Sequence, residues 1–377
     1  MAQQHLDPTE PLAGPAPTGD TLAGYLRAQA TEFLRALRLH RENGSGANGA
    51  EGSVEAARAL RRSARRISAS LHTFQSLLDT DWCEGMRPEL AWVSGTLALE
   101  HAYTARLERL LSALHRLSGS TAMPAQPAGA AEADVVAGSR AAGAAPVPTR
   151  AAPRDAGLRT PPASPPERGN LTVGAAKAGA LLDRQLTLAR TRAHSTALQA
   201  LGSSRFHAIA DKVAVLASEV PLTPAAATAD LRPLATAAKD RLTDAVAALP
   251  LITAGHPYNA AALIHGLSPD TVPHPQDAPW HQVRLLLRLH RYAREAVSGP
   301  KGNTVVDLRL LSAGQALNRH RDASEAAAAA AQAARTPRIA PATAYALGVL
   351  HADQRHEVEA ARFAFQQAWQ KEAVSTR

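Results

Sequence analysis

The stretch from residue 280 to residue 292, WHQVRLLLRLHRY, limits what this chain can fold into. In a helix, at about 100° per residue, its cations fall in one narrow stripe and its apolar side chains fall on the opposite side. The stripe holds His281, Arg284, Arg288 and Arg291, and Val283, Leu287 and His290 lie opposite. The next acid along the chain is Glu295. We therefore expect a helix with one side in a core and a cationic side that has no partner of its own.

A second segment, from 57 to 74, repeats the pattern with the sequence ARALRRSARRISASLHTF. On the same helical wheel its stripe contains Arg58, Arg61, Arg65 and His72, flanked by Arg62 and Arg66. The first three positions of this stripe have the same offsets as the first three of the other stripe. Two basic helices that share one register, far apart in the sequence, indicate an internal repeat.

The second basic helix, with His281-Gln282-Val283-Arg284 followed by Arg288, Arg291 and Tyr292, resembles the signature helix of the CHAD (conserved histidine α-helical) domain. The first basic helix resembles the same element of the family's other half, with Arg58 where that half normally has histidine. Shorter similarities follow in chain order at Ser204-Arg205-Phe206, Thr223-Pro224 and His320-Arg321-Asp322. Other positions depart from the family pattern, namely His101-Ala102, Thr104 and Leu289.

The resemblance implies an all-α fold of two pseudo-symmetric helical bundles whose basic faces meet in a central groove. It also implies that this groove binds inorganic polyphosphate, that the protein associates with polyphosphate granules, and that it is not an enzyme. Accordingly we assign no catalytic residues and no cofactor.

The composition agrees with a helical protein. Alanine is abundant and aromatic residues make up only 4%, and alanine is the best helix former. The formal net charge of +8 favours polyanionic partners. A single cysteine, Cys83, excludes an intramolecular disulfide and a zinc site built on several cysteines. The sequence shows neither a signal-peptide layout nor an apolar run of roughly 20 residues, so we expect a cytoplasmic protein without a membrane span.

Four segments are expected along the chain: a disordered N-terminus at 1–19, a first helical half at 20–118, a flexible Ala/Pro/Gly-rich insert at 119–172, and the remaining helical part at 173–373. The insert has too few large apolar groups to offset the entropy of ordering. Helical periodicity predicts helices at about 20–41, 53–78, 84–118, 173–200, 204–218, 224–249, 277–297, 304–335 and 341–373.

Arginine suits polyphosphate because its planar fork pairs with phosphate oxygens at two points and keeps its charge. If the cationic stripes of the two basic helices face each other, they would hold a linear polyanion from both sides. Three cations outside the rows, on the helices at 173–200 and 224–249, are further candidates. The candidate polyphosphate-binding residues are Arg58, Arg61, Arg65, Arg66, His281, Arg284, Arg288, Arg291, Tyr292, Arg190, Lys239 and Arg241.

Each feature also has a structural explanation. Runs of charge are usually solvated helix faces. The residues leave open whether His281 contacts the ligand or bonds to a backbone group, whereas His290, Trp92 and Trp280 are expected in the core.

Two other functions remain as alternatives. A nucleic-acid binder fits the positive charge, but aromatic side chains for base stacking are few. A phosphohydrolase would need clustered carboxylates to hold metal ions, and none lies near the basic helices. The scattered histidines do not show metal-ligand spacing. The sequence does not define the oligomeric state or the role of the insert.

Overall fold

The computed structural model describes residues 16–43, 50–119, 167–255, 263, 267, 275–299 and 307–370. In this part of the chain the fold is all-α, as expected, and it contains no strand beyond an isolated β-bridge between Leu78 and Leu222. The predicted disorder at 1–19 and at 119–172 falls largely outside the described residues. Residues 16–19 and 167–172 are exceptions, because the structure describes both segments: α1 begins at Gly19, and the predicted flexible insert is wrong from Glu167 onwards, where α4 begins.

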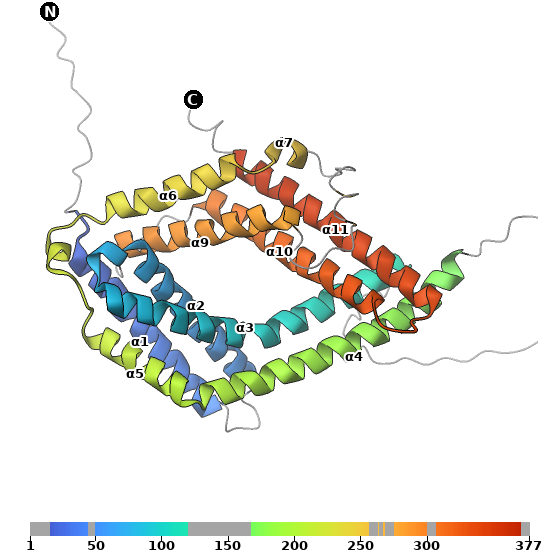
Figure 1. Cartoon of the computed structure of the whole chain (residues 1–377), viewed down its shortest axis with the longest axis horizontal. Coiled ribbons are helices and arrows are strands. Elements are labelled where there is room, and N and C mark those ends of the chain that lie inside the picture. The colour runs from blue at the N-terminus through green and yellow to red at the C-terminus, as the bar shows by residue number, and fades with distance from the viewer. Residues whose placement is uncertain are drawn as a thin grey trace, which may run out of the picture.

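The predicted helices, apart from the one at 224–249, are present with small shifts of their ends (Figure 1). Side-chain caps fix several starts: Asp79 accepts from the backbone N–H of Trp82 at 2.8 Å, and Ser203 accepts from that of Phe206 at 3.2 Å. The helices are α1 Gly19–Asn43, α2 Ala50–Thr73, α3 Thr80–Leu117, α4 Glu167–Leu201, α5 Ser204–Ser218, α6 Arg232–Ala247, α7 Leu251–Ala254, α9 Ala278–Ser298, α10 Leu308–Ala334 and α11 Pro341–Gln370, with 3₁₀ turns η1 Gln75–Leu77, η2 Pro224–Ala227 and η3 Pro275–Asp277.

The prediction of a single helix at 224–249 is wrong. The chain makes the 3₁₀ turn η2 and then starts a new helix, α6, at Arg232. Pro233 explains the break, because proline donates no backbone hydrogen bond and its ring clashes with a preceding helical turn. The side chain of Asp230 accepts from the backbone N–H of Arg232 at 2.9 Å and helps to set the new start.

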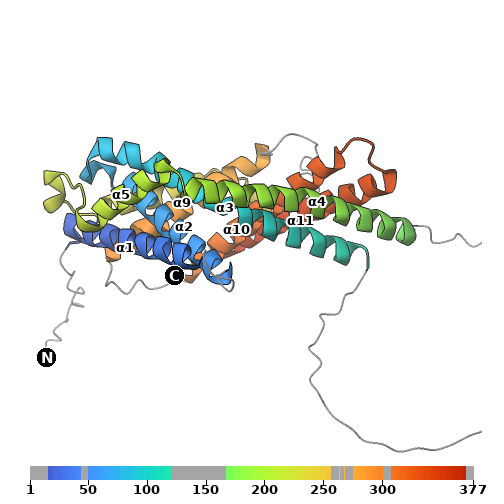
Figure 2. The ribbon, with the colours of Figure 1, turned by 90° about the horizontal axis from the view of Figure 1, so that it is seen from below.

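The helices form two bundles that share α3. One core lies between α1, α2, α5 and the first half of α3, and it is filled by large side chains such as Phe33, Phe74 and Phe206. The other bundle contains two adjoining cores. One joins the end of α3 to α4, α10 and α11, and the other joins α6, α9, α10 and α11 around Trp280 and Phe365. Figure 2 shows the elongated result, with α1 and α5 at one end and α4 and α11 towards the other.

Alanine makes the tight packing of α10 on α11 possible. Ala326, Ala330 and Ala333 of α10 are fully buried in the same core as Ala346 of α11. Side chains this small let two helix backbones approach closely over several turns. The alanine-rich composition therefore serves helix-on-helix packing, as the sequence indicates.

Candidate functional site

The two basic helices lie side by side where the two bundles meet, because α9 packs against α2 as well as α6 and α10 (Figure 1). Their rows of arginine come within electrostatic reach of each other. Burial lowers the pKa of Arg288 on α9, and the positive charge of Arg65 on α2 lowers it further. The predicted facing of the rows is therefore present at this pair.

A third helix, α10, adds Arg321 to the same place. Burial lowers the pKa of Arg61 to about 10, and Arg65 and Arg321 contribute to the decrease. Burial lowers the pKa of Arg284 to about 9, with contributions from Arg288 and Arg321. Both guanidinium groups still carry their charge at neutral pH. We call Arg61, Arg65, Arg284, Arg288 and Arg321 the arginine cluster.

Acids neutralise this cluster only in part. Arg321 is bonded to Asp322 and lies 3.7 Å from Glu325. Arg284 donates through Nε to the side-chain oxygen of Asn318 at 2.8 Å, which is a neutral partner. Within the described parts of the chain, the four cluster members on α2 and α9 form no ion pair. The Nε of Arg61 is buried and has no hydrogen-bond partner there. The cluster therefore keeps unpaired positive charge.

Arg58 and His101 extend the cluster at one end. Arg58 is exposed and pairs with Glu55 on its own helix at 3.5 Å. Burial lowers the pKa of His101 on α3, and Arg58 and Arg61 lower it further. The three side chains thus lie near one another, although His101 comes from a helix without a basic stripe.

A cavity of about 250 Å³ between α2, α3 and α9 continues the cluster at the other end. Arg65 and Arg288 belong both to the cluster and to the wall of this cavity. Burial lowers the pKa of His72 in the wall, with contributions from Arg87 and from Arg241 on α6. The structure therefore places Arg241 near this end. We call this cavity of about 250 Å³ the lateral cavity. Its lining residues are Arg65, Ser68, Ala69, His72, Arg87, Leu285, Arg288, Leu289 and Tyr292.

A buried ionic network supports the start of α9. Asp277 is fully buried and accepts hydrogen bonds from Arg355 at 2.8 Å and Arg362 at 2.7 Å, both on α11. Burial opposes ionisation of Asp277, but His320 and Arg355 outweigh it and hold the pKa of that carboxyl below its usual range. Trp280 stacks on His320 with ring centroids 5.7 Å apart. These contacts fix α9 against α10 and α11.

His281 lies between this network and the arginine cluster. Its ring meets the ring of His320 edge-on, with centroids 5.5 Å apart. Burial lowers the pKa of His281, and among nearby charges Asp277 raises it while Arg284 lowers it. Its Nε2 is buried without a hydrogen-bond partner among the residues described. Trp280 and His290 are buried, as predicted for core residues, and Trp92 is half-buried beneath Arg205.

Comparison with known proteins agrees with this architecture. A family model for the CHAD domain matches residues 28–331.

This chain belongs to the CHAD domain family.

Two solved structures are similar to it. One, PptA from Streptomyces chartreusis, is 77% identical, with a match that covers 94% of this chain and 100% of that chain at a TM-score of 0.72. The other is the crystal structure of the CHAD domain from the plant Ricinus communis, which is 15% identical and covers 98% of this chain and 96% of that chain at a TM-score of 0.48. The search of curated proteins found no match.

Several candidate residues of this CHAD domain have other partners or lie elsewhere. Arg66 is bonded to Glu295 at 2.8 Å, and its guanidinium lies 5.7 Å from the centre of the Tyr292 ring. Arg291 lies with its guanidinium beside Gly314 of α10. The charge of Arg66 is therefore engaged within the protein, whereas Tyr292 lines the lateral cavity.

Lys239 and Arg190 are not part of the cluster. Lys239 lies close enough to His290 to affect its pKa, which burial lowers to about 4. His290 faces the core side of α9, so Lys239 lies on the side of that helix opposite the arginines. Arg190 is on α4, which packs mainly along α3 and α11. These two predictions from charge alone are not supported by the geometry.

Arg321 is a site residue that the sequence alone did not predict. The run His320-Arg321-Asp322 stands out in the sequence, but α10 shows no basic stripe, because alanine dominates the rest of the helix after this run. The one feature of the sequence that could have indicated this residue is the arginine that directly follows the buried His320. Only the packing of α10 against α9 turns that arginine towards Arg61 and Arg284.

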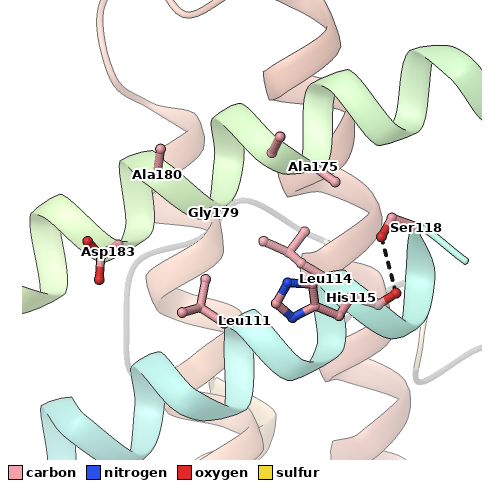
Figure 3. A pocket seen from close by; sticks show the side chains of 9 residues that line it. Leu111, Leu114, His115, Ser118, Ala175, Gly179, Ala180 and Asp183 are labelled. Carbon is pink, nitrogen blue, oxygen red and sulfur yellow. Dashed lines mark hydrogen bonds between the residues drawn. The ribbon is translucent and has the colours of Figure 1, made fainter. Parts of the chain in front are cut away.

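A second cavity, of about 400 Å³, lies between α3 and α4 (Figure 3), and no member of the arginine cluster lines it. Leu111 and Leu114 form much of its wall, with His115 at one side and Asp183 at the other. Ser118 donates to the backbone oxygen of His115 at 3.1 Å. Since no arginine or lysine lines it, this cavity does not fit a polyanion.

In the described part of the chain, no three His, Cys, Asp or Glu residues come together in a way that could hold a metal ion. In the same part, no helix combines the length and the apolar character needed to cross a membrane.

Proposed function

We propose that this CHAD domain binds inorganic polyphosphate along the arginine cluster without acting on it chemically. One observation carries the proposal. Five arginines from three helices lie within electrostatic reach of one another, and four of them, Arg61, Arg65, Arg284 and Arg288, have no carboxylate partner among the described residues. Such an arrangement costs free energy in the unbound protein, and a polyanion supplies the missing negative charge.

The chemistry of polyphosphate suits this surface. The polymer carries negative charge on every phosphate and has no bases to read. Guanidinium groups in a row bind phosphate oxygens in pairs and remain charged. Arg58 at one end, and Arg87 in the wall of the lateral cavity with Arg241 near it at the other, lengthen the cationic track beyond the cluster.

The nearest acids support binding rather than hydrolysis. Asp322 is bonded to Arg321, and Glu325 accepts from Arg106 at 2.5 Å. Carboxylates engaged in this way are poorly placed to hold the magnesium ions that phosphoryl hydrolysis uses. Binding would keep the chain on polyphosphate granules in the cytoplasm, which is the biological role that we propose.

The test is the affinity for long-chain polyphosphate at near-physiological salt, measured for the wild type and for Arg284→Glu/Arg288→Glu. We expect the double variant to lose binding while its helical circular dichroism is retained. Arg190→Glu/Lys239→Glu is the matched control, because it changes the net charge equally outside the cluster. Equal loss in both variants would show that only the overall charge matters.

RNA is the alternative ligand of the same surface, and competition separates the two. We expect polyphosphate to displace single-stranded RNA at similar phosphate concentration, because few aromatic side chains border the arginines for base stacking. Displacement of polyphosphate by RNA under those conditions would favour the nucleic-acid function.

A further inference from the structure

The lateral cavity has walls that polyphosphate does not need. Leu285, Leu289, Tyr292 and Ala69 give it a largely apolar lining. Leu285 is 44% exposed, so part of its apolar side chain is open to a ligand. A chain of phosphates has no apolar atoms to place against these side chains. The free energy of removing apolar surface from water is available only to a ligand with an apolar part.

The cavity is continuous with the arginine cluster. Arg65 and Arg288 line the cavity and also face the other members of the cluster. Any group bound among the leucines would therefore have its attached anionic tail directed along the arginines. His72 and Arg87 add polar contacts in the cavity wall.

The size of the cavity suits one ring system. Its volume of about 250 Å³ is below the roughly 300–1,000 Å³ of pockets that enclose whole drug-sized ligands. Tyr292 offers a flat surface in the wall. Its orientation is held by Arg66, which lies 5.7 Å from the ring centre and is itself bonded to Glu295. A ring held in place before binding loses little freedom when a ligand stacks on it.

We propose that the lateral cavity receives the base of a nucleoside polyphosphate whose phosphate tail lies along the arginine cluster. This inference rests on the proposed function, because the tail uses the same arginines. It adds a ligand class, small nucleotides with three or more phosphates. Tyr292 is the one Phe, Tyr or Trp side chain among the residues that line the cavity, so the site fits a single base better than a run of stacked bases.

The experiment compares ATP with inorganic tripolyphosphate by titration calorimetry, without magnesium, on the full chain. The two ligands carry similar charge, so the base is the main difference. We expect ATP to bind at least about fivefold more tightly, as one stacked base allows. In Leu285→Gln/Leu289→Gln we expect that advantage to disappear while the affinity for tripolyphosphate is unchanged. Leu188→Gln on α4, where the leucine is 48% exposed, is the matched control.

The outcomes separate this inference from the proposed function. Tight binding of tripolyphosphate with no advantage for ATP would overturn the nucleotide site and leave the proposed function intact. Failure of both long-chain polyphosphate and tripolyphosphate to bind the wild type would overturn both. An ATP advantage that survives the double leucine variant would place the base elsewhere and overturn the assignment of the lateral cavity.

Discussion

Arg61 on α2 and Arg321 on α10 lie within electrostatic reach of each other, although they are 260 positions apart in a sequence of 377 residues. Burial lowers the pKa of Arg61 to about 10, and Arg321 is among the neighbouring charges that contribute. Packing of the second bundle against the first thus places like charges together. A bound polyanion would relieve their repulsion. Because the folded protein gathers these arginines, it should bind the polyanion more tightly than the unfolded chain does, and binding should raise the thermal midpoint.

The salt dependence of binding should report on Arg321. We expect Arg321→Gln to weaken polyphosphate binding several-fold and to reduce the slope of log affinity against log salt by about one, because one fewer phosphate is neutralised. Asp322→Asn should act in the opposite direction, since it removes the acid bonded to Arg321. Titrations at several salt concentrations measure both, and an unchanged slope in Arg321→Gln would exclude a phosphate contact there.

Two neighbouring arginines on α2 should differ in what they contribute. Arg65 belongs to the cluster, so Arg65→Gln should reduce affinity for polyphosphate with little change in stability. Arg66 is bonded to Glu295, which also accepts from the Tyr25 hydroxyl at 3.3 Å. We therefore expect Arg66→Gln to keep affinity within about twofold and to lose about 1–3 kcal/mol of unfolding free energy. Urea denaturation measures the stability of each variant, and titration calorimetry measures its affinity for polyphosphate. A stability loss in Arg65→Gln together with an affinity loss in Arg66→Gln would contradict these assignments.

Asp277 should be essential for stability. Its removal leaves Arg355 and Arg362 buried without their shared carboxylate, and breaking one side of a buried ion pair costs about 3–5 kcal/mol. Asp277→Ala should therefore shift the urea midpoint strongly. The matched control is Asp230→Asn, which removes an exposed carboxylate paired with Arg232 and should leave the midpoint unchanged. Similar small effects in both would mean that the network is dispensable.

Stability should fall in mild acid because of buried histidines. Burial lowers the pKa of His320 and of His290 to about 4, below the value of roughly 6.5 in an unfolded chain. Above a pH of roughly 6.5, these histidines are neutral in both the folded and the unfolded state. As pH falls from 6.5 towards 4, the unfolded chain binds protons first and stability is lost, by about 2 kcal/mol per histidine at pH 5.

The unfolding free energy at pH 7.5 and at pH 5 measures this effect. In His290→Asn the difference between the two pH values should be smaller than in the wild type, because one titrating group has been removed. Equal stability at both pH values in the wild type would show that these histidines are not held neutral in the fold.

The sequence predicts where most helices lie along the chain, but it does not predict which helices pack against one another. Lys239 and Arg241 are separated by one residue on α6, and both are candidates from charge. In the structure Lys239 lies near His290 on the core side of α9, whereas Arg241 lies near His72 at the lateral cavity. Helical periodicity shows that two such positions point in different directions, but the contacts of α6 decide which one meets the site.

The length of α3 shows the same limit at the level of bundles. Leu90 lies in the core of the first bundle and Leu114 in a core of the second. The two leucines belong to one apolar pattern that runs along the whole helix. Nothing in this pattern shows where α3 leaves the core of one bundle and enters the core of the other. It depends on the helices that reach α3 from elsewhere in the chain.

The sequence by itself determined the helices and the two basic rows, because residues three, four and seven positions apart share a face of any α-helix. It also determined the family, through the order of its short motifs. Only the tertiary structure decided that Arg65 faces Arg288, that Arg321 joins them, and that Arg66 is bonded to Glu295. The physical reason is that these relationships depend on how buried side chains of distant segments fit together, and no local spacing encodes that fit.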